Sequence, residues 1–143
     1  MRNTIAILST LFVLSALVSI VSCSKKQQPD TPTTRVQGRW KKAQYATDDN
    51  NNGRIDEQEK RTQQVNFTDI ISLSPDATGY QAVNHDNFVD TAAFAWFVGG
   101  DSLFIDYAAH LSVHYHIEHV NSLSLQLLTT TSTGLAWYNY VKQ

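Results

Sequence analysis

Residues 94–107 read FAWFVGGDSLFIDY, and their alternation predicts the fold class of the chain. Large apolar residues occupy every second position on both sides of a Gly-Gly-Asp break: Phe94, Trp96 and Val98 before it, and Leu103, Ile105 and Tyr107 after it. A period of two places such side chains on one face of a β-strand. A break this short joins antiparallel neighbours, because a parallel crossover needs about a dozen residues or more. The stretch therefore predicts a β-hairpin with one buried face.

The same alternation recurs on both sides of this hairpin. It predicts eight antiparallel strands, near residues 36–46, 65–73, 78–84, 92–98, 102–107, 111–119, 122–130 and 135–142. Eight strands in sequence order can close into an up-and-down barrel, which leaves no exposed sheet edge. The sequence thus predicts an all-β fold, an eight-stranded antiparallel barrel. A β-sandwich would use the same pattern and is the alternative.

The N-terminus indicates export and lipid attachment. The first three residues carry one Arg, and residues 5–21 are apolar apart from small hydroxyl side chains, as in a secretory signal peptide. The segment Ile20-Val21-Ser22-Cys23 resembles the lipobox of bacterial lipoproteins, in which the chain is cut before the cysteine and the cysteine is acylated. Cys23 is the only cysteine among 143 residues. We therefore expect a signal peptide over residues 1–22 and palmitate or a related acyl chain on Cys23, anchoring the protein to a membrane.

The mature chain divides into a tether and one domain. Residues 23–35 are polar and hold two of the three prolines, which predicts a flexible tether. Ser24 stands where inner-membrane lipoproteins of some bacteria carry Asp, so this resemblance favours the outer membrane, with the periplasmic face of the inner membrane as the alternative. Residues 36–143 have the length of a single domain. With 11 basic and 13 acidic residues, the chain lacks the charge expected of a nucleic-acid-binding protein.

Gly38-Arg39-Trp40 opens the first expected strand and resembles the G-x-W signature of lipocalins. The motifs that follow resemble bacterial lipocalin-like domain lipoproteins in their order and spacing: VNFTDIISLSPDATGY at 65–80, FAWFVGGDSLFID at 94–106 and HIEHVNSLSLQLL at 116–128. This resemblance implies a small barrel, and most members of the family have no assigned activity. It also implies that Trp40 closes one end of the barrel.

Four aromatic residues are the candidates for lining a ligand cavity: Trp40, Phe94, Trp96 and Trp137. An eight-stranded barrel can be filled by its own side chains or hold one small ligand. Side chains of this size favour a mostly filled interior.

Residues 48–59, DDNNNGRIDEQE, match the calcium loop of an EF-hand. The candidate ligands are Asp48, Asn50, Asn52, Arg54 through its carbonyl, Asp56 and Glu59. Ca²⁺ takes six to eight oxygen ligands, and Gly53 stands at the sharp turn of the loop. A strand precedes the loop and a short helix is expected after it, near residues 56–64, so the pattern predicts a structural site without a paired EF-hand. A solvated Asn/Asp turn is the alternative.

His114 and His116 have the H-x-H spacing that can chelate Zn²⁺ or Cu²⁺. An exposed polar strand face is the favoured explanation of this pair. The chain contains no G-x-S-x-G, P-loop or H-E-x-x-H motif. The sequence therefore favours a non-enzymatic, lipid-anchored envelope protein whose calcium loop supports binding of a partner protein or ligand. A carrier of a small hydrophobic ligand is the alternative, and an envelope enzyme is less favoured.

Overall fold

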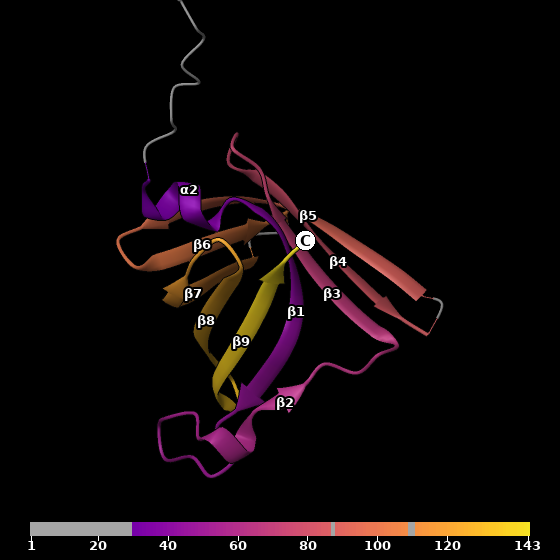
Figure 1. Ribbon diagram of the computed structural model, residues 1–143, viewed down its shortest axis with the longest axis vertical. Helices are drawn as coiled ribbons and strands as arrows, with labels where there is room; N and C mark the ends of the chain where they lie inside the picture. Colours follow the sequence, from indigo (N-terminus) through magenta and orange to yellow (C-terminus); the bar gives the residue numbers. More distant parts are fainter. Residues whose placement is uncertain (1–29, 87, 109–110) are drawn as a thin grey trace, which may run out of the picture.

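Antiparallel strands dominate the structure, a computed structural model that describes residues 30–86, 88–108 and 111–143 (Figure 1). The elements, in chain order, are α2 (Pro32–Val36), β1 (Gly38–Thr47), the 3-10 turn η2 (Glu57–Glu59), β2 (Arg61–Thr62), β3 (Phe67–Leu73), β4 (Thr78–His85), β5 (Phe88–Gly99), β6 (Ser102–Tyr107), β7 (Leu111–Val120), β8 (Ser124–Thr131) and β9 (Gly134–Lys142). Every predicted strand overlaps an observed one, and the two-residue β2 is additional. The predicted all-β class is confirmed.

The strands form one sheet that closes on itself. Neighbouring strands follow the order β2-β1-β3-β4-β5-β6-β7-β8-β9, and β1 also pairs with β9. This closing seam runs from the pair Trp40–Lys142 to the pair Thr47–Ala136. Because β2 only extends one edge of β1, the other eight strands form a closed barrel. The barrel, and not the alternative sandwich, is therefore the observed architecture.

Close-packed apolar side chains fill one end of the barrel. The buried cluster contains Val36, Trp40, Ile71, Leu73, Phe94, Trp96, Leu103, Ile105, Leu125, Leu127 and Tyr140. Helix α2 lies at this end (Figure 1), and the Trp40 indole donates a hydrogen bond of 2.6 Å to the Val36 carbonyl. Trp40 therefore closes this end of the barrel, as the sequence predicts.

Gly79 makes room for one of the largest of these side chains. A Cβ atom at Gly79 would overlap the Phe94 ring and the Ser72 carbonyl oxygen. Phe94 therefore packs directly against the backbone of β4. Two residues further on, the Trp96 indole donates to the Thr78 carbonyl at 2.9 Å. These contacts leave the closed end filled.

Two local elements differ from the prediction. In place of the short helix expected near residues 56–64, the structure has η2 and then β2, because Arg61 pairs with Tyr45 of β1. The expected tether is ordered at its end, since α2 covers Pro32–Val36 and Thr31 caps the helix. Among the described residues, no helix has the length and apolar character needed to cross a bilayer.

Candidate functional site

The open end of the barrel interior is polar, and an ion pair lies at its centre. Strands β1 and β3 carry Lys42 and Asp69 on their inner faces, and Lys42 Nζ donates a hydrogen bond to Asp69 Oδ2. The two side chains are 14% and 4% exposed. Lys42 Nζ also lies 4.7 Å from the ring centroid of Tyr138, which is cation–π geometry. The interior therefore holds two opposite charges that compensate each other.

A chain of hydrogen bonds continues from Asp69 across the barrel. The Gln81 amide of β4 donates to Asp69 Oδ1 at 3.0 Å, and the Tyr107 hydroxyl of β6 donates to Gln81 Oε1 at 2.7 Å. Both carboxylate oxygens of Asp69 therefore accept a hydrogen bond, and both ends of the Gln81 amide are used.

Three more tyrosines face this space from β7 and β9. The ring centroids of Tyr115 and Tyr138 are 6.3 Å apart, and those of Tyr138 and Tyr140 are 6.5 Å apart. Their hydroxyls form no hydrogen bond with any described residue. We call the surrounding set the tyrosine chamber; it consists of Lys42, Asp69, Gln81, Tyr107, Tyr115, Tyr138 and Tyr140.

The three unpaired hydroxyl oxygens each keep some exposed surface, although the tyrosine rings belong to the core or pack against it. Tyr140 is only 3% exposed, yet its hydroxyl is not sealed in packed protein. Among the described residues, the one enclosed polar side-chain atom without a partner is Asn139 Oδ1, outside the chamber. Native interiors pair nearly all their buried polar groups. The chamber is therefore a place where water or a ligand can complete the hydrogen bonding.

The chamber disfavours further negative charge. Burial raises the pKa of Tyr107, Tyr115, Tyr138 and Tyr140, and the Asp69 carboxylate raises each pKa further. The physical cause is that an ionised phenol loses hydration and meets a like charge. The same two effects act on any other anion in this space.

A pocket of about 300 Å³ lies at the barrel mouth, lined by Lys42, Tyr45, Gln63, Gln64 and Phe67. A β-bulge in β1 after Lys42 keeps Lys42 and Tyr45 both on the inner side of the wall. The Gln63 amide N–H donates to the carbonyl of Ala43, in that bulge, at 2.9 Å, so the segment after β2 forms part of the rim. The pocket adjoins the chamber, because Lys42 belongs to both and the register partners of Lys42 and Tyr45 in β9 are Tyr140 and Tyr138.

The predicted cavity residues lie elsewhere. Trp40, Phe94 and Trp96 face the interior but form its packed end. The prediction for Trp137 is wrong, because Trp137 points to the outer face of β9, opposite Tyr138 and Tyr140. There it is 4% exposed, with Lys60 Nζ 4.8 Å from its ring centroid.

The tyrosine chamber is absent from the sequence prediction. Lys42 and Asp69 interrupt the apolar alternation of their strands. In the sequence, such an interruption only weakens the strand prediction. The signal that identifies them is their spacing from inward-facing apolar residues: Lys42 follows Trp40 by two residues, and Asp69 precedes Ile71 by two. Polar residues at inward positions therefore predict a polar interior.

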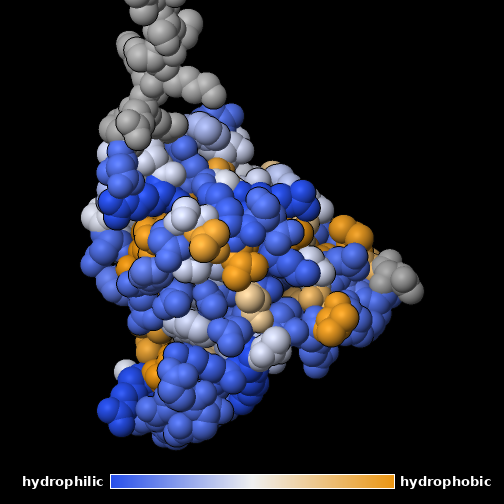
Figure 2. Space-filling model, viewed as in Figure 1, coloured by the Kyte–Doolittle hydropathy of each residue, from blue (hydrophilic) through white to orange (hydrophobic). Residues whose placement is uncertain are grey.

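The acidic loop after β1 forms a hydrophilic lobe at the lower end of the molecule in Figure 2. Asp48 is 6% exposed, and its carboxylate accepts from the backbone N–H groups of Asn52 at 3.0 Å and Gly53 at 2.8 Å. Glu59 is 5% exposed and accepts from the N–H groups of Asp49 and Asp56, each at 2.9 Å. The carboxylates of Asp48 and Glu59, the first and last acids of the pattern, thus stabilise the loop by accepting hydrogen bonds from its backbone.

The middle of the loop converges on one carboxylate oxygen. The side-chain amides of Asn50 and Asn52 donate to Asp56 Oδ2 at 3.1 Å and 2.9 Å. These two hydrogen bonds lower the pKa of Asp56. Arg54 exposes its side chain and places Nε 3.4 Å from Asp56 Oδ1. Within the described part of the chain, no three acidic, histidine or cysteine side chains are arranged to hold a metal, so the predicted calcium site stays a prediction.

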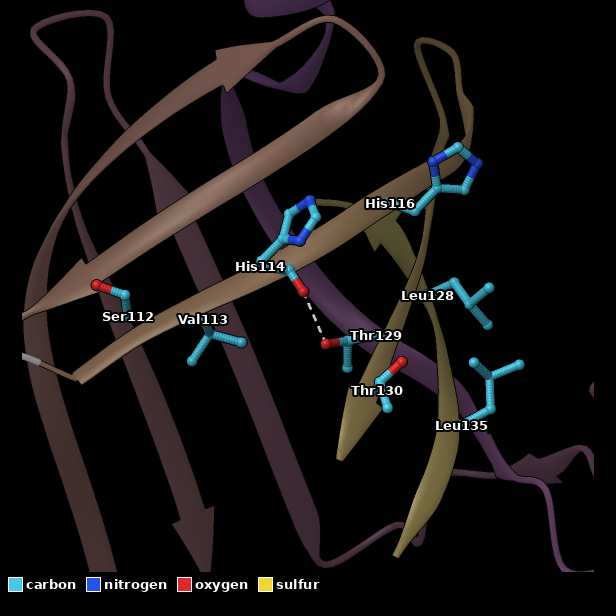
Figure 3. Close-up of a pocket in the computed structure, with 8 residues that line it drawn as sticks. All are labelled: Ser112, Val113, His114, His116, Leu128, Thr129, Thr130 and Leu135. Atoms are coloured by element: carbon cyan, nitrogen blue, oxygen red, sulfur yellow. Dashed lines mark hydrogen bonds between the residues drawn. The ribbon is translucent and has the colours of Figure 1, made fainter. Parts of the chain in front are cut away.

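His114 and His116 lie on the outer face of β7, beside a cleft of about 500 Å³ between β7 and β8 (Figure 3). Pairing of these strands ends at His116–Leu128, and the Thr129 hydroxyl donates to the His114 carbonyl at 2.7 Å. The His114 ring stacks on Phe104 with centroids 4.7 Å apart, and His116 Nδ1 lies 3.5 Å from Asp101. Each imidazole therefore has its own neighbour on an exposed polar face.

Cys23, the predicted lipidation site, lies outside the described residues.

The chain matches no protein-family model and no curated protein. Solved structures do resemble it. A lipocalin-like protein from Bacteroides uniformis aligns with a TM-score of 0.58 and 11% identity, over 76% of this chain and 99% of that one. The fold is lipocalin-like. An uncharacterized protein from Bacteroides eggerthii also aligns, with a TM-score of 0.52 and 8% identity, over 75% of this chain and 98% of that one.

Proposed function

We propose that this chain is a lipid-anchored protein of the cell envelope whose lipocalin-like barrel binds a small ligand in the tyrosine chamber without transforming it. One observation carries the proposal: Tyr140 is 3% exposed, and its hydroxyl has no hydrogen-bond partner in the described structure. This hydroxyl can be reached from solvent, so it is open to a hydrogen bond from water or from a ligand, and such a bond contributes about 0.5–1.5 kcal/mol net. A molecule that enters through the mouth can replace that water and bond this hydroxyl.

The packed end of the barrel disfavours the alternative of a carrier for a hydrophobic ligand. Trp40 is fully buried, Phe94 is 6% exposed and Trp96 is 3% exposed. An apolar ligand among them would need to displace packed side chains, and overpacking a core costs about 1–3 kcal/mol. The mouth pocket is lined instead mostly by residues with charged, hydroxyl or amide groups: Lys42, Tyr45, Gln63 and Gln64, beside Phe67.

The chamber also suits binding better than catalysis. A general base needs an oxygen that faces the substrate. Both oxygens of Asp69 already accept hydrogen bonds, from Lys42 and Gln81. The pair can hold a ligand in place through the remaining N–H groups of Lys42.

Native mass spectrometry of the full chain, purified in mild detergent, tests the ligand proposal. We expect a small molecule to co-purify with the wild type and to be depleted in Tyr140→Phe, which removes only the hydroxyl. Tyr80→Phe is the matched control, because Tyr80 lies on the outer face of β4 and is 37% exposed. Equal occupancy in the Tyr140 and Tyr80 variants would place the ligand elsewhere, and no bound molecule in any preparation would contradict the proposal.

Calcium bound to residues 48–59 forms the second part of the proposal, as a structural ion. The loop is already folded by its own hydrogen bonds, and two amide N–H groups stand where a cation would neutralise Asp56. Binding requires both amides to rotate their oxygens inward. Three charged ligands and this rearrangement point to weak affinity, on the order of 10⁻⁴–10⁻³ M, as in extracellular modules.

A calcium titration of melting temperature tests this site. At about 100 times the dissociation constant, Ca²⁺ should stabilise the wild type by roughly 2.7 kcal/mol. Glu59→Gln should lose most of that gain, and Asp49→Asn should retain it, because Asp49 pairs with Arg61 and is no ligand of the pattern. The absence of any calcium-dependent shift up to about 10 mM, above that affinity range, would leave the loop a solvated turn.

Acylation of Cys23 is the third part of the proposal and rests on the Ile20-Val21-Ser22-Cys23 sequence. Metabolic labelling with a fatty-acid analogue should mark the wild type, and Cys23→Ala should yield an unlabelled, uncleaved precursor. Ser22→Ala is the control, because it keeps a small residue before the cysteine. Labelling of the Cys23→Ala protein would refute the anchor.

A further inference from the structure

The tyrosine chamber has hydrogen-bond donors to spare, and its unpaired acceptors are the oxygens of the tyrosine hydroxyls. The two carboxylate oxygens of Asp69 accept from Lys42 and Gln81, and the amide oxygen of Gln81 accepts from Tyr107. Lys42 forms one hydrogen bond and lines the mouth pocket, so two of its three ammonium N–H groups are available. The unpaired hydroxyls of Tyr115, Tyr138 and Tyr140 can each donate or accept. A ligand that bonds the Lys42 ammonium must bring oxygen or nitrogen acceptors.

The charge of the chamber selects against anions. Lys42 and Asp69 already compensate each other, and no other cation belongs to the chamber. An added carboxylate would sit beside Asp69 with no charge to balance it, and like charges across a binding interface cost several kcal/mol in general. The ligand's acceptors are therefore carbonyl, ether or hydroxyl oxygens on an uncharged molecule.

Aromatic faces and size narrow the class further. The rings of Tyr115 and Tyr138 meet edge to face at 73°, and Tyr45 and Phe67 line the way in. The mouth pocket of about 300 Å³ is at the lower limit for small-molecule sites. Such a site fits a single ring that can lie against aromatic side chains.

From these constraints we infer that the chamber binds a compact, uncharged ring molecule rich in oxygen acceptors, with the chemistry of a single pyranose sugar. Lys42 and the hydroxyls of Tyr138 and Tyr140 donate to its oxygens, and the tyrosine rings contact its C–H face. This inference rests on the proposed ligand-binding function and specifies the ligand class.

Saturation-transfer NMR on the full chain in mild detergent tests the ligand class. The probes are methyl glucopyranoside, methyl galactopyranoside and methyl mannopyranoside, each paired with its uronate, which differs by one carboxylate. We expect saturable binding of at least one neutral glycoside, with its uronate weaker by roughly tenfold or more because of Asp69. Tyr138→Phe and Tyr140→Phe should each weaken the neutral probe roughly threefold to tenfold, as for a lost hydrogen bond. Tyr80→Phe should not change it.

Two results would overturn the inference. Equal or tighter binding of the uronates would identify an anion site. No saturable binding of any neutral glycoside at about 100 mM, far weaker than the ~1 mM range of low-affinity ligands, would exclude the class. In either case, a molecule that co-purifies with the wild type and is lost from Tyr140→Phe would leave the proposed function standing, so the two failures are distinguishable.

Discussion

Replacing Lys42 by Met tests whether the interior ion pair is as buried as the structure indicates. The substitution keeps a side chain of similar length but leaves Asp69 charged, 4% exposed and without its cation. Removing one partner of a buried ion pair costs about 3–5 kcal/mol. Loss of the cation–π contact with Tyr138 adds about 0.5–2 kcal/mol. We therefore expect Lys42→Met to lose at least about 3 kcal/mol of unfolding free energy.

The double variant Lys42→Met/Asp69→Leu separates burial from packing. Replacing both charges by apolar groups is often neutral or stabilising, so the double variant should recover most of the loss. Arg61→Met is the surface control, because Arg61 and Asp49 are 47% and 49% exposed and such pairs contribute about 0–1 kcal/mol. Urea unfolding measures the unfolding free energy of the three variants. The slope of this free energy against urea concentration should be the same in each variant. A Lys42→Met loss no larger than that of Arg61→Met, or a double variant no better than the single one, would refute the reasoning.

Two further predictions concern packing and pH. Gly79→Ala should destabilise the barrel by about 1–3 kcal/mol or more, because the new methyl group meets the Phe94 ring and a backbone oxygen; Gly99→Ala, whose nearest neighbour is Phe104 at 3.4 Å, should cost far less, and equal losses in thermal melts would contradict this packing. The four chamber tyrosines have raised pKa values in the folded state, so the stability they contribute is complete below about pH 10, the pKa of an unfolded tyrosine, and is lost as pH rises towards their folded pKa values. Ultraviolet titration should show these four ionising above about pH 10, and their ionisation at or below that pH would disprove it.

The strands were predictable because each buries one face and most are joined by short, tight turns. The hairpin of β5 and β6 shows both signals, since Trp96 pairs with Ile105 on the inner face and Gly99 pairs with Ser102 at the turn. Barrel closure depends on the register between β1 and β9, and no local pattern in either strand specifies the partner. The residues after the acidic loop carry a helical charge pattern, yet Arg61 pairs with β1 because the tertiary edge there is open.

The site was harder to predict than the fold for a physical reason. Alternation says which residues share a face but not which face is inside when both carry aromatic residues. In β9, Trp137 and Tyr138 are equally good candidates; the register of β9 turns Trp137 outwards, where Lys60 covers its ring. Polar residues at inward positions, such as Asp69, weaken the apolar pattern, so the same residues that form the chamber reduce its visibility in the sequence.

Helix α2 and Trp40 close the end of the barrel at which the chain enters. Figure 1 shows α2 at that end and β2 at the opposite end, where Gln63 and Gln64 line the mouth pocket. Seven residue steps separate Cys23 from Asp30, a reach of at most about 25 Å when extended. A lipid on Cys23 would hold the closed end towards the bilayer and turn the mouth to the aqueous side. Solutes would then reach the chamber from water, and molecules dissolved in the membrane would face the sealed end.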